Sequence, residues 1–217
     1  MPKKYIEIPD GFIVFISGVP GVGKTTISYE LLKRYDKFRI IEETDIMREI
    51  LRGYNTFLTE KFGEEVNFIF NQITIPDHNK ILNLEEAKEQ CCYMKNSLEQ
   101  IVARQQRKGI ATIINGVHIV PEIMNGLAQN FNIIYINLYI DNEQVLYQRL
   151  VNRDPKSYLV NYTPLLYKIN KDLFDSTATL SRQNNFLFNN INITKLSIVE
   201  VIDIIQDCIK ELLIHAN

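Results

Sequence analysis

The sequence has few cysteines and no long apolar run, and both shortages narrow what the protein can be. Its 217 residues include only three cysteines, of which Cys91 and Cys92 are adjacent and Cys208 stands alone. That spacing indicates neither a disulfide framework nor a zinc site. No apolar run approaches the roughly 18 residues that a membrane helix requires, so we expect no membrane partner.

Basic blocks are also missing. The formal net charge is −2, and no run of about five basic residues occurs. We therefore expect no nucleic-acid partner, although a local basic patch stays open. The chain begins with Lys3 and Lys4 but continues into acidic residues and proline, without the apolar core of a signal peptide. These features together predict a cytoplasmic protein.

What the sequence does contain is an ordinary core and one strong motif. With 46% hydrophobic and 23% charged residues, the chain can bury a core of normal size, and its length predicts a single domain over residues 1–217. The motif is Gly18-Val19-Pro20-Gly21-Val22-Gly23-Lys24-Thr25-Thr26, which matches the phosphate-binding pattern G-x-x-x-x-G-K-[ST].

The context of this loop supports its assignment. It follows the apolar run 12–16 and precedes the helix-compatible segment 25–34, as the motif requires. Glycines let backbone N–H groups turn toward a phosphate, and the helix start adds partial positive charge. We predict that this loop binds ATP, that Lys24 reaches the β- and γ-phosphates, and that Thr25 holds Mg²⁺.

Apolar runs typical of buried strands alternate with helical patterns along the chain, which predicts a parallel sheet with helices on both faces. We expect the helix after the second strand to stop at Gly53, and a capping box from Asp141 to Gln144 to open a later helix. The predicted strands are 12–16, 38–41, 110–114, 131–138 and 186–188.

Ligands of such sheets lie at the carboxyl ends of the strands, where Asp45 and Asn115 fall. Asp45 is at a helix start, where a carboxylate stays ionised, and we predict that it orients the acceptor hydroxyl as a catalytic group. Arg48 and Arg52 follow at one-turn intervals and could bind an anionic acceptor. The alternative is that Asp45 only caps the helix and both arginines are solvated.

Four further side chains are weaker candidates. Arg149 and Arg153 bracket the start of a loop, and we predict that they stabilise the transferring phosphoryl group within a lid over residues 149–163. A solvated helix end is the alternative. Arg182 is a possible nucleotide contact. His118, just beyond a strand end, is either a buried structural histidine or a substrate-binding residue.

Two classes of phosphate-loop protein are disfavoured. Switch GTPases require a D-x-x-G element and an N-K-x-D guanine reader, and neither occurs in this chain. Motor-type ATPases usually carry an acidic residue after the strand that here ends in Asn115. A small kinase therefore fits best.

Four segments together resemble the 2-phosphoglycerate kinase family of P-loop kinases. One of them, the phosphate loop preceded by Ile16-Ser17, is generic, and another is the segment from Arg149 to Arg153. The combination of the other two, Thr44-Asp45-Ile46-Met47-Arg48-Glu49 and Ile113-Ile114-Asn115-Gly116-Val117-His118-Ile119-Val120-Pro121, is fairly specific. Where the family pattern has Glu before Gly-Val-His, this chain has Asn115.

The resemblance implies transfer of the ATP γ-phosphate to the hydroxyl of 2-phosphoglycerate. Arg48, Arg52 and His118 would then lie at the acceptor, and we predict Asn115 there as well. The irregular pattern of residues 54–83 separately predicts a substrate-covering insertion. We expect a P-loop NTPase three-layer α/β sandwich with a five-stranded, mostly parallel sheet in the order 2-3-1-4-5. A monomer or homodimer is expected.

Two other functions stay open: a zeta-toxin-like or nucleotide kinase with a nucleotide-like acceptor, and a non-catalytic nucleotide-binding module. The second is motivated by Asn115, because an amide brings no charge to Mg²⁺.

Overall fold

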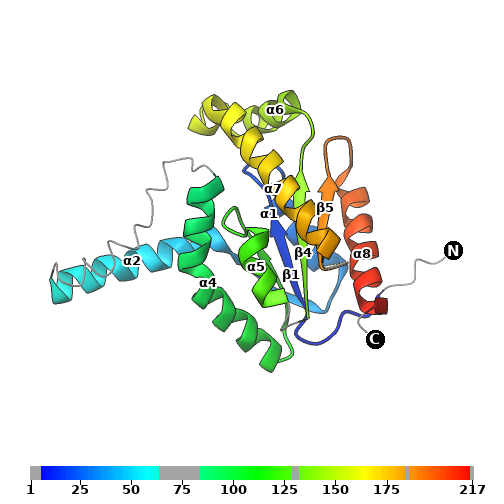
Figure 1. The fold of residues 1–217 in the computed structure, drawn as a ribbon, viewed down its shortest axis with the longest axis horizontal. Coiled ribbons are helices and arrows are strands. Elements are labelled where there is room, and N and C mark those ends of the chain that lie inside the picture. Colours follow the sequence, from blue (N-terminus) through cyan, green and yellow to red (C-terminus); the bar gives the residue numbers. More distant parts are fainter. Residues whose placement is uncertain (1–5, 64–83, 129–131, 184–185, 216–217) are drawn as a thin grey trace.

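A computed structural model describes residues 6–63, 84–128, 132–183 and 186–215 of the chain. At its centre lies a five-stranded sheet in the order β2-β3-β1-β4-β5, in which every neighbouring pair is parallel (Figure 1). The predicted order and the α/β class are confirmed. The strands are β1 (Ile13–Ser17), β2 (Phe38–Glu43), β3 (Ala111–Asn115), β4 (Ile133–Tyr139) and β5 (Phe188–Asn192).

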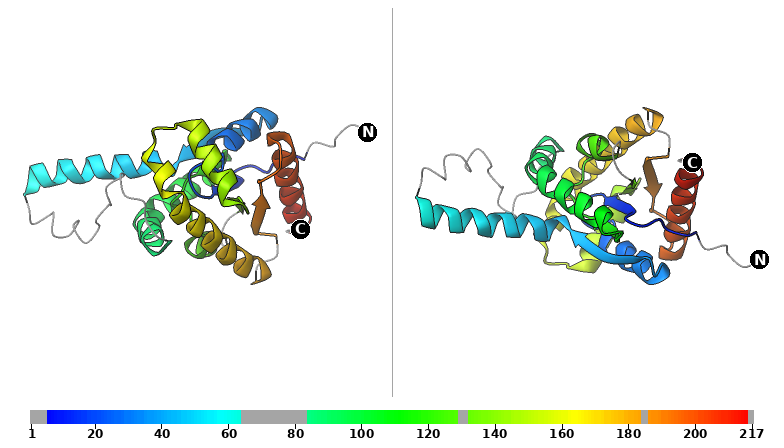
Figure 2. Two further views of the ribbon diagram at one scale, coloured as in Figure 1. Left: turned by 90° about the horizontal axis from the view of Figure 1, so that it is seen from above. Right: turned by 90° about the horizontal axis from the view of Figure 1, so that it is seen from below.

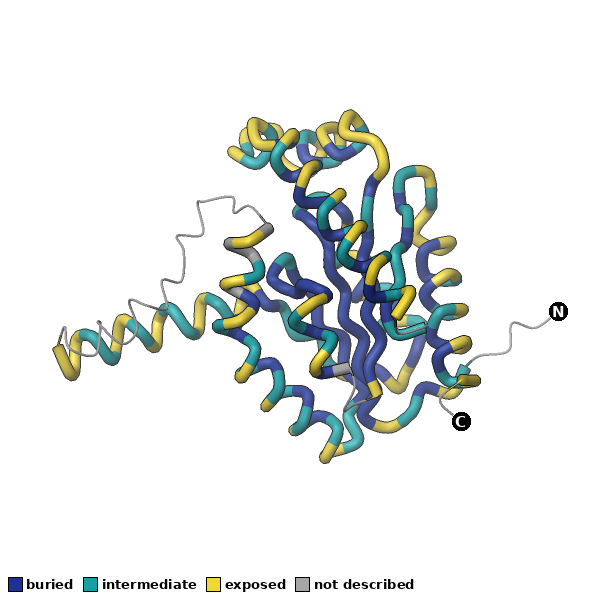
Figure 3. The backbone as a smooth tube through the Cα atoms, viewed as in Figure 1, coloured by how far each residue is buried: buried dark blue, intermediate teal, exposed yellow. Residues whose placement is uncertain are grey.

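The three central strands β3, β1 and β4 are almost entirely buried, because helices cover both faces of the sheet (Figure 3). One face packs against α4, α5 and α7, and the other against α1 and α8. The helices are α1 (Lys24–Arg34), α2 (Thr44–Phe62), α4 (Leu84–Arg107), α5 (Pro121–Ala128), α6 (Glu143–Arg153), α7 (Thr163–Gln183) and α8 (Ile198–His215), with a 3₁₀ turn, η1 (Tyr158–Tyr162).

Parallel pairing brings the carboxyl ends of the strands to one edge, where the candidate site lies. Ile16 of β1 pairs with Asn115 of β3, and Glu43 of β2 pairs with the same residue. The phosphate loop, the start of α2 and the segment after β3 therefore meet at this edge. No helix within the described ranges is both long and apolar enough to cross a membrane.

The structure corrects the predicted end of the helix after β2. α2 continues through Gly53 to Phe62 and is capped by Gly63, whose φ of 81° favours glycine. Gly53 keeps helical geometry and costs the helix only about 1 kcal/mol relative to alanine. The second half of α2 leaves the body as an arm (Figures 1 and 2). The predicted insertion 54–83 thus begins as helix, and its residues 64–83 lie outside the described residues.

Two other boundaries also differ from the prediction. The last strand is not 186–188 but β5, so it runs through the asparagine-rich stretch. The cap of α6 is Asn142, whose side chain accepts from the Val145 N–H. Asp141 instead accepts a hydrogen bond from Asn192 of β5.

Candidate active site

The phosphate loop joins the end of β1 to the start of α1 and has the shape that a phosphate cradle needs. Gly18 has a φ of 136°, and a Cβ there would come within 2.5 Å of the Leu138 carbonyl oxygen, so the position accepts only glycine. Gly23 precedes α1 with a φ of 86°. The first turn of α1 carries no acidic residue, which leaves its N-terminal partial charge free for an anion.

Lys24 folds over this loop. Its ammonium donates to the carbonyl oxygens of Gly18 at 2.8 Å and Val19 at 3.1 Å. Burial lowers the pKa of Lys24 to about 8, while the charge of Asp45 opposes that shift. A phosphate placed in the loop would raise the pKa of Lys24 again, because its negative charge favours the ammonium.

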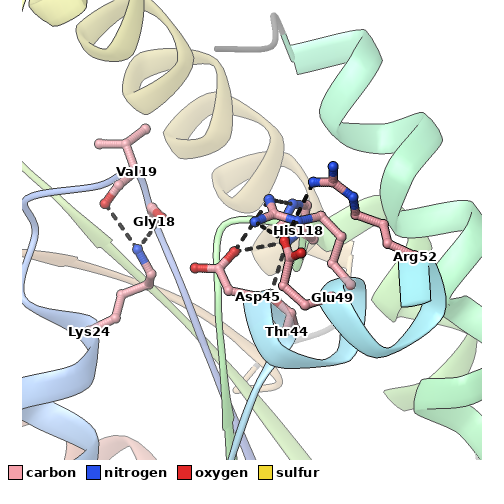
Figure 4. Close-up of polar contacts among 9 residues, drawn as sticks. Gly18, Val19, Lys24, Thr44, Asp45, Glu49, Arg52 and His118 are labelled. Atoms are coloured by element: carbon pink, nitrogen blue, oxygen red, sulfur yellow. Dashed lines mark hydrogen bonds and ion pairs between the residues drawn. The ribbon is translucent and has the colours of Figure 1, made fainter. Parts of the chain in front are cut away.

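Asp45 lies at the start of α2 and faces this lysine from across the strand ends (Figure 4). Its carboxylate is 3.6 Å from the Arg48 guanidinium and 3.6 Å from Nδ1 of His118. Asp45 is 55% exposed, whereas Arg48 is only 17% exposed, so the carboxylate is open to an incoming molecule. Asp45 and Arg48 are one helix turn apart on α2, whereas His118 follows Arg48 by 70 positions. The structure therefore brings together residues that are distant in the sequence.

His118, from the segment between β3 and α5, is the most enclosed member of this cluster at 2% exposure. Its Nδ1 lies 3.1 Å from the hydroxyl of Thr44, and its Nε2 lies 3.4 Å from Nη1 of Arg48. Burial lowers the pKa of His118 to about 4, against the opposing pull of the Asp45 carboxylate. The imidazole is therefore neutral at physiological pH.

Glu49 is a polar neighbour that the sequence did not single out as a site residue. Its carboxylate accepts hydrogen bonds from Arg48 at 3.1 and 3.2 Å and lies 3.6 Å from Arg52 (Figure 4). Both arginines thus contact the same carboxylate. An anionic acceptor would offer them a negatively charged group of the same kind.

Asn115, the last residue of β3, contacts α1 through its side chain. It is 3% exposed, and its amide donates to the Ser28 hydroxyl, which in turn donates to the Lys24 carbonyl oxygen. Ser28 is one helix turn after Thr25, which is exposed on the first turn of α1.

The residues at this point fit Mg²⁺ that is held mainly by phosphate oxygens. Thr25 supplies a hydroxyl oxygen, which suits a hard cation. Among the residues that the structure describes, no three His, Cys, Asp or Glu side chains converge to hold a metal by themselves. A bound Mg²⁺ would neutralise charge on the phosphates.

A pocket of about 280 Å³ opens on the other side of the loop. Arg149 of α6 lines it and donates to the Ile193 carbonyl oxygen at 2.7 Å. The rest of the lining is mainly apolar and includes the loop glycines Gly21 and Gly23, Thr26, and the segment after β5 with Ile193, Leu196, Ile198 and Val201. The sequence missed this last segment, because the strand that precedes it was placed several residues too early.

The two remaining arginines differ in position. Arg153, at the end of α6, is close enough to lower the pKa of Lys24 through its charge. Arg182 is exposed in the last turn of α7, which leads to the amino end of β5. The phosphate loop follows the carboxyl end of a parallel strand, so Arg182 lies at the opposite edge of the sheet and does not join the site. The predicted lid 149–163 comprises the end of α6, a turn and η1.

Comparison with known proteins agrees with this geometry. Residues 14–162 match the model of the AAA domain family. The chain is 27% identical over 201 residues to the 2-phosphoglycerate kinase of Methanococcus maripaludis, covering 84% of this chain and 61% of that protein. It is 30% identical over 156 residues to the mevalonate-3-phosphate 5-kinase of Thermoplasma acidophilum, covering 70% and 69%. The resemblance seen in the four sequence segments is confirmed.

The chain spans about three-fifths of the length of the 2-phosphoglycerate kinase that it matches. Among solved structures, a gluconokinase from Sinorhizobium meliloti has a TM-score of 0.58 with this chain and 11% identity, over 94% of this chain and 95% of that one. This likeness shows the fold alone. Loop, fold and relatives together identify a P-loop domain of the kind found in small-molecule kinases.

Proposed function

We propose that this chain, which belongs to the AAA domain family, is an ATP-dependent kinase that phosphorylates a hydroxyl of a small anionic acceptor. The observation that carries the proposal is the position of Asp45. Its exposed carboxylate faces Lys24 on one side and Arg48 on the other, so it separates the phosphate loop from a basic pair. A kinase needs its acceptor hydroxyl at that point.

Each residue then has a defined task. Asp45 orients the hydroxyl and takes its proton as the hydroxyl oxygen bonds to the γ-phosphorus, while the bond from that phosphorus to ADP breaks. Lys24 and Arg153 offset the negative charge that develops on the transferring group. Arg48 and Arg52 hold the anionic part of the acceptor. Thr25 would hold Mg²⁺ against the ATP phosphates.

For Arg149 we propose a different task from the one predicted from the sequence. Its guanidinium is tied to the carbonyl of Ile193 in the apolar pocket beside the loop. We propose that this pocket takes the nucleotide base and that Arg149 forms one of its walls. An enzyme of this kind needs a supply of ATP, and we therefore propose that it acts in the cytoplasm.

For the acceptor we propose 2-phosphoglycerate, giving 2,3-bisphosphoglycerate. Mevalonate 3-phosphate is the second candidate, because one relative bears that name at 30% identity. Both molecules carry a carboxylate, a phosphate and a free hydroxyl. Arg48 and Arg52, which already meet the Glu49 carboxylate, suit such groups.

The test is a transfer assay with γ-labelled ATP and Mg²⁺, using the full chain and the Lys24→Ala variant. The acceptor panel contains 2-phosphoglycerate, mevalonate 3-phosphate, nucleosides and nucleotide sugars. We expect label on 2-phosphoglycerate with the parent chain and none with the variant. Label on a nucleoside or nucleotide sugar would replace the proposal by a nucleotide-type kinase. ATP binding with no transfer to any acceptor would favour the non-catalytic module.

A further inference from the structure

His118 lies within the acceptor cluster but has no atom to offer to a substrate. It is 2% exposed, and both of its ring nitrogens have partners: Thr44 and Asp45 at Nδ1, and Arg48 at Nε2. The sequence suggested that His118 binds the acceptor. The geometry points instead to an effect through the residues around it.

The identity of these partners decides where the imidazole carries its proton. A guanidinium has only donors, so Nε2 must accept from Arg48 and cannot carry hydrogen. The proton is then on Nδ1, where the Thr44 hydroxyl oxygen can accept it at 3.1 Å, while the Asp45 carboxylate at 3.6 Å acts on the ring through its charge. The charged groups that act on the ring are Asp45 and Arg48 from α2 and Lys24 from α1. Burial, Arg48 and Lys24 lower the pKa of the ring and outweigh Asp45, which raises it, so the ring is neutral.

Gly116 explains how α2 comes so close to the segment that carries His118. A Cβ on Gly116 would overlap the side chain of Thr44, the first residue of α2. With no side chain there, the first turn of α2 packs directly on the end of β3. The imidazole of His118 therefore connects the segment after β3 with the first turn of α2, which pack closely together at Gly116.

We propose that His118 is a positioning residue, which holds the Arg48 guanidinium and the Asp45 carboxylate at the acceptor as a neutral ring protonated on Nδ1. The inference rests on the proposed function in one respect, namely that Arg48 contacts the acceptor. A histidine that protonated at this place would lose its acceptor nitrogen and repel Arg48.

A spectroscopic experiment tests the ring without any activity. The chain has three histidines, so ¹⁵N-histidine NMR gives signals from three rings. The signals that are lost in His118→Asn belong to His118. We expect a neutral ring with its proton on Nδ1 from pH 8 to about 5.5. Arg48→Ala should shift its Nε2 signal, while the control Arg52→Ala should not. An Nε2-protonated ring, or one that titrates near pH 6.5, would overturn the proposal even if the kinase activity is found.

Kinetics with 2-phosphoglycerate form the second arm. Asn lacks an acceptor at the position of Nε2, so His118→Asn should raise KM for 2-phosphoglycerate about tenfold and leave KM for ATP unchanged. Gln can present its amide oxygen there, so His118→Gln should recover most of the loss. In an Arg48→Ala background, His118→Asn should add nothing. Equal losses in both KM values, or additive losses in the double variant, would mean a merely structural role.

If 2-phosphoglycerate is not phosphorylated, the proposed acceptor fails, and the NMR experiment alone decides the role of His118.

Discussion

At the scale of the residue, Asn115 shows how one side chain can be both structural and functional. Its amide donates to Ser28, and the Ser28 hydroxyl continues to the Lys24 carbonyl oxygen, so the end of β3 supports the first turn of α1 from below. A carboxylate of the same shape could not make the first of these bonds, because it has no donor. Compared with a carboxylate, the amide brings no negative charge near the Mg²⁺ site, but it adds a hydrogen bond that supports the start of α1.

This exchange predicts the effect of Asn115→Asp. The new carboxylate adds negative charge beside Ser28, one turn of α1 from Thr25, so the Mg²⁺ concentration for half-maximal ATP turnover should fall several-fold. Without metal and nucleotide, the buried charge should lower the melting temperature by several degrees. Magnesium titrations of turnover and thermal melts with and without Mg²⁺ and ATP measure the two effects.

Ser28→Ala is the matched control, because it removes the same hydrogen bond without adding charge. It should leave the Mg²⁺ requirement of turnover unchanged. If Asn115→Asp needs as much Mg²⁺ as the parent chain, the amide is not what weakens metal binding.

At the scale of the element, α2 carries the acceptor residues in its first three turns and then extends away from the body. Its first turn is fixed by Thr44 and buried Met47, whereas Ile50, Tyr54 and Phe57 further along are largely exposed. The site thus uses the anchored end of this helix, where side-chain positions are well determined.

Gly53 lies at the middle of the helix and offers a direct test of its continuity. It is exposed, its backbone is helical, and a Cβ would meet nothing within 4 Å. Gly53→Ala should therefore raise the free energy of unfolding by about 0.5–1 kcal/mol, and the melting temperature by roughly 2–4 °C.

Gly63→Ala supplies the contrast for that measurement, because its φ of 81° disfavours any residue with a Cβ. It should lower the melting temperature. A loss of stability in Gly53→Ala, measured in the same melts, would mean that the helix does not pass through this position in solution.

The elements also show what the sequence could and could not predict. The phosphate loop was readable because its chemistry is local: glycines, a lysine and a threonine in fixed spacing between a strand and a helix. The end of α2 was predicted wrongly at Gly53, because glycine is common at helix ends. One exposed glycine inside a helix lowers its stability only slightly. β5 was misplaced because its asparagines are unusual in a strand. One of them is satisfied by a buried partner on β4, Asn137, which no local pattern reveals.

The same limit applies to the site. Asp45 and Arg48 were found from their place after a strand. The enclosure of His118 could not be found, since its partner Thr44 is 74 positions away and the contact depends on Gly116 having no side chain. Arg182 was placed at the nucleotide on the strength of its nearness to a strand, but it precedes that strand and so lies at the wrong edge of the sheet.

At the scale of the whole molecule, His118 ties folding stability to pH. Its pKa is about 4 in the folded chain, against about 6.5 when unfolded, because burial penalises the charged ring. Between these two values the unfolded chain binds the proton and the folded chain does not. The stability that this ring contributes is therefore complete above about pH 6.5 and is lost as the pH falls toward 4.

The slope in that window is about 1.4 kcal/mol per pH unit, so lowering the pH from 7 to 5.5 should cost the parent chain about 1 kcal/mol through this ring. Urea unfolding of the parent and of His118→Asn at both pH values isolates the effect. Apart from Asp45, which lies next to His118, the remaining titratable groups are the same in both proteins. The parent should lose about 1 kcal/mol more than His118→Asn does. Equal losses in the two proteins would show that His118 titrates as freely in the folded chain as in the unfolded one, and the neutral bridge between α2 and the end of β3 would then be wrong.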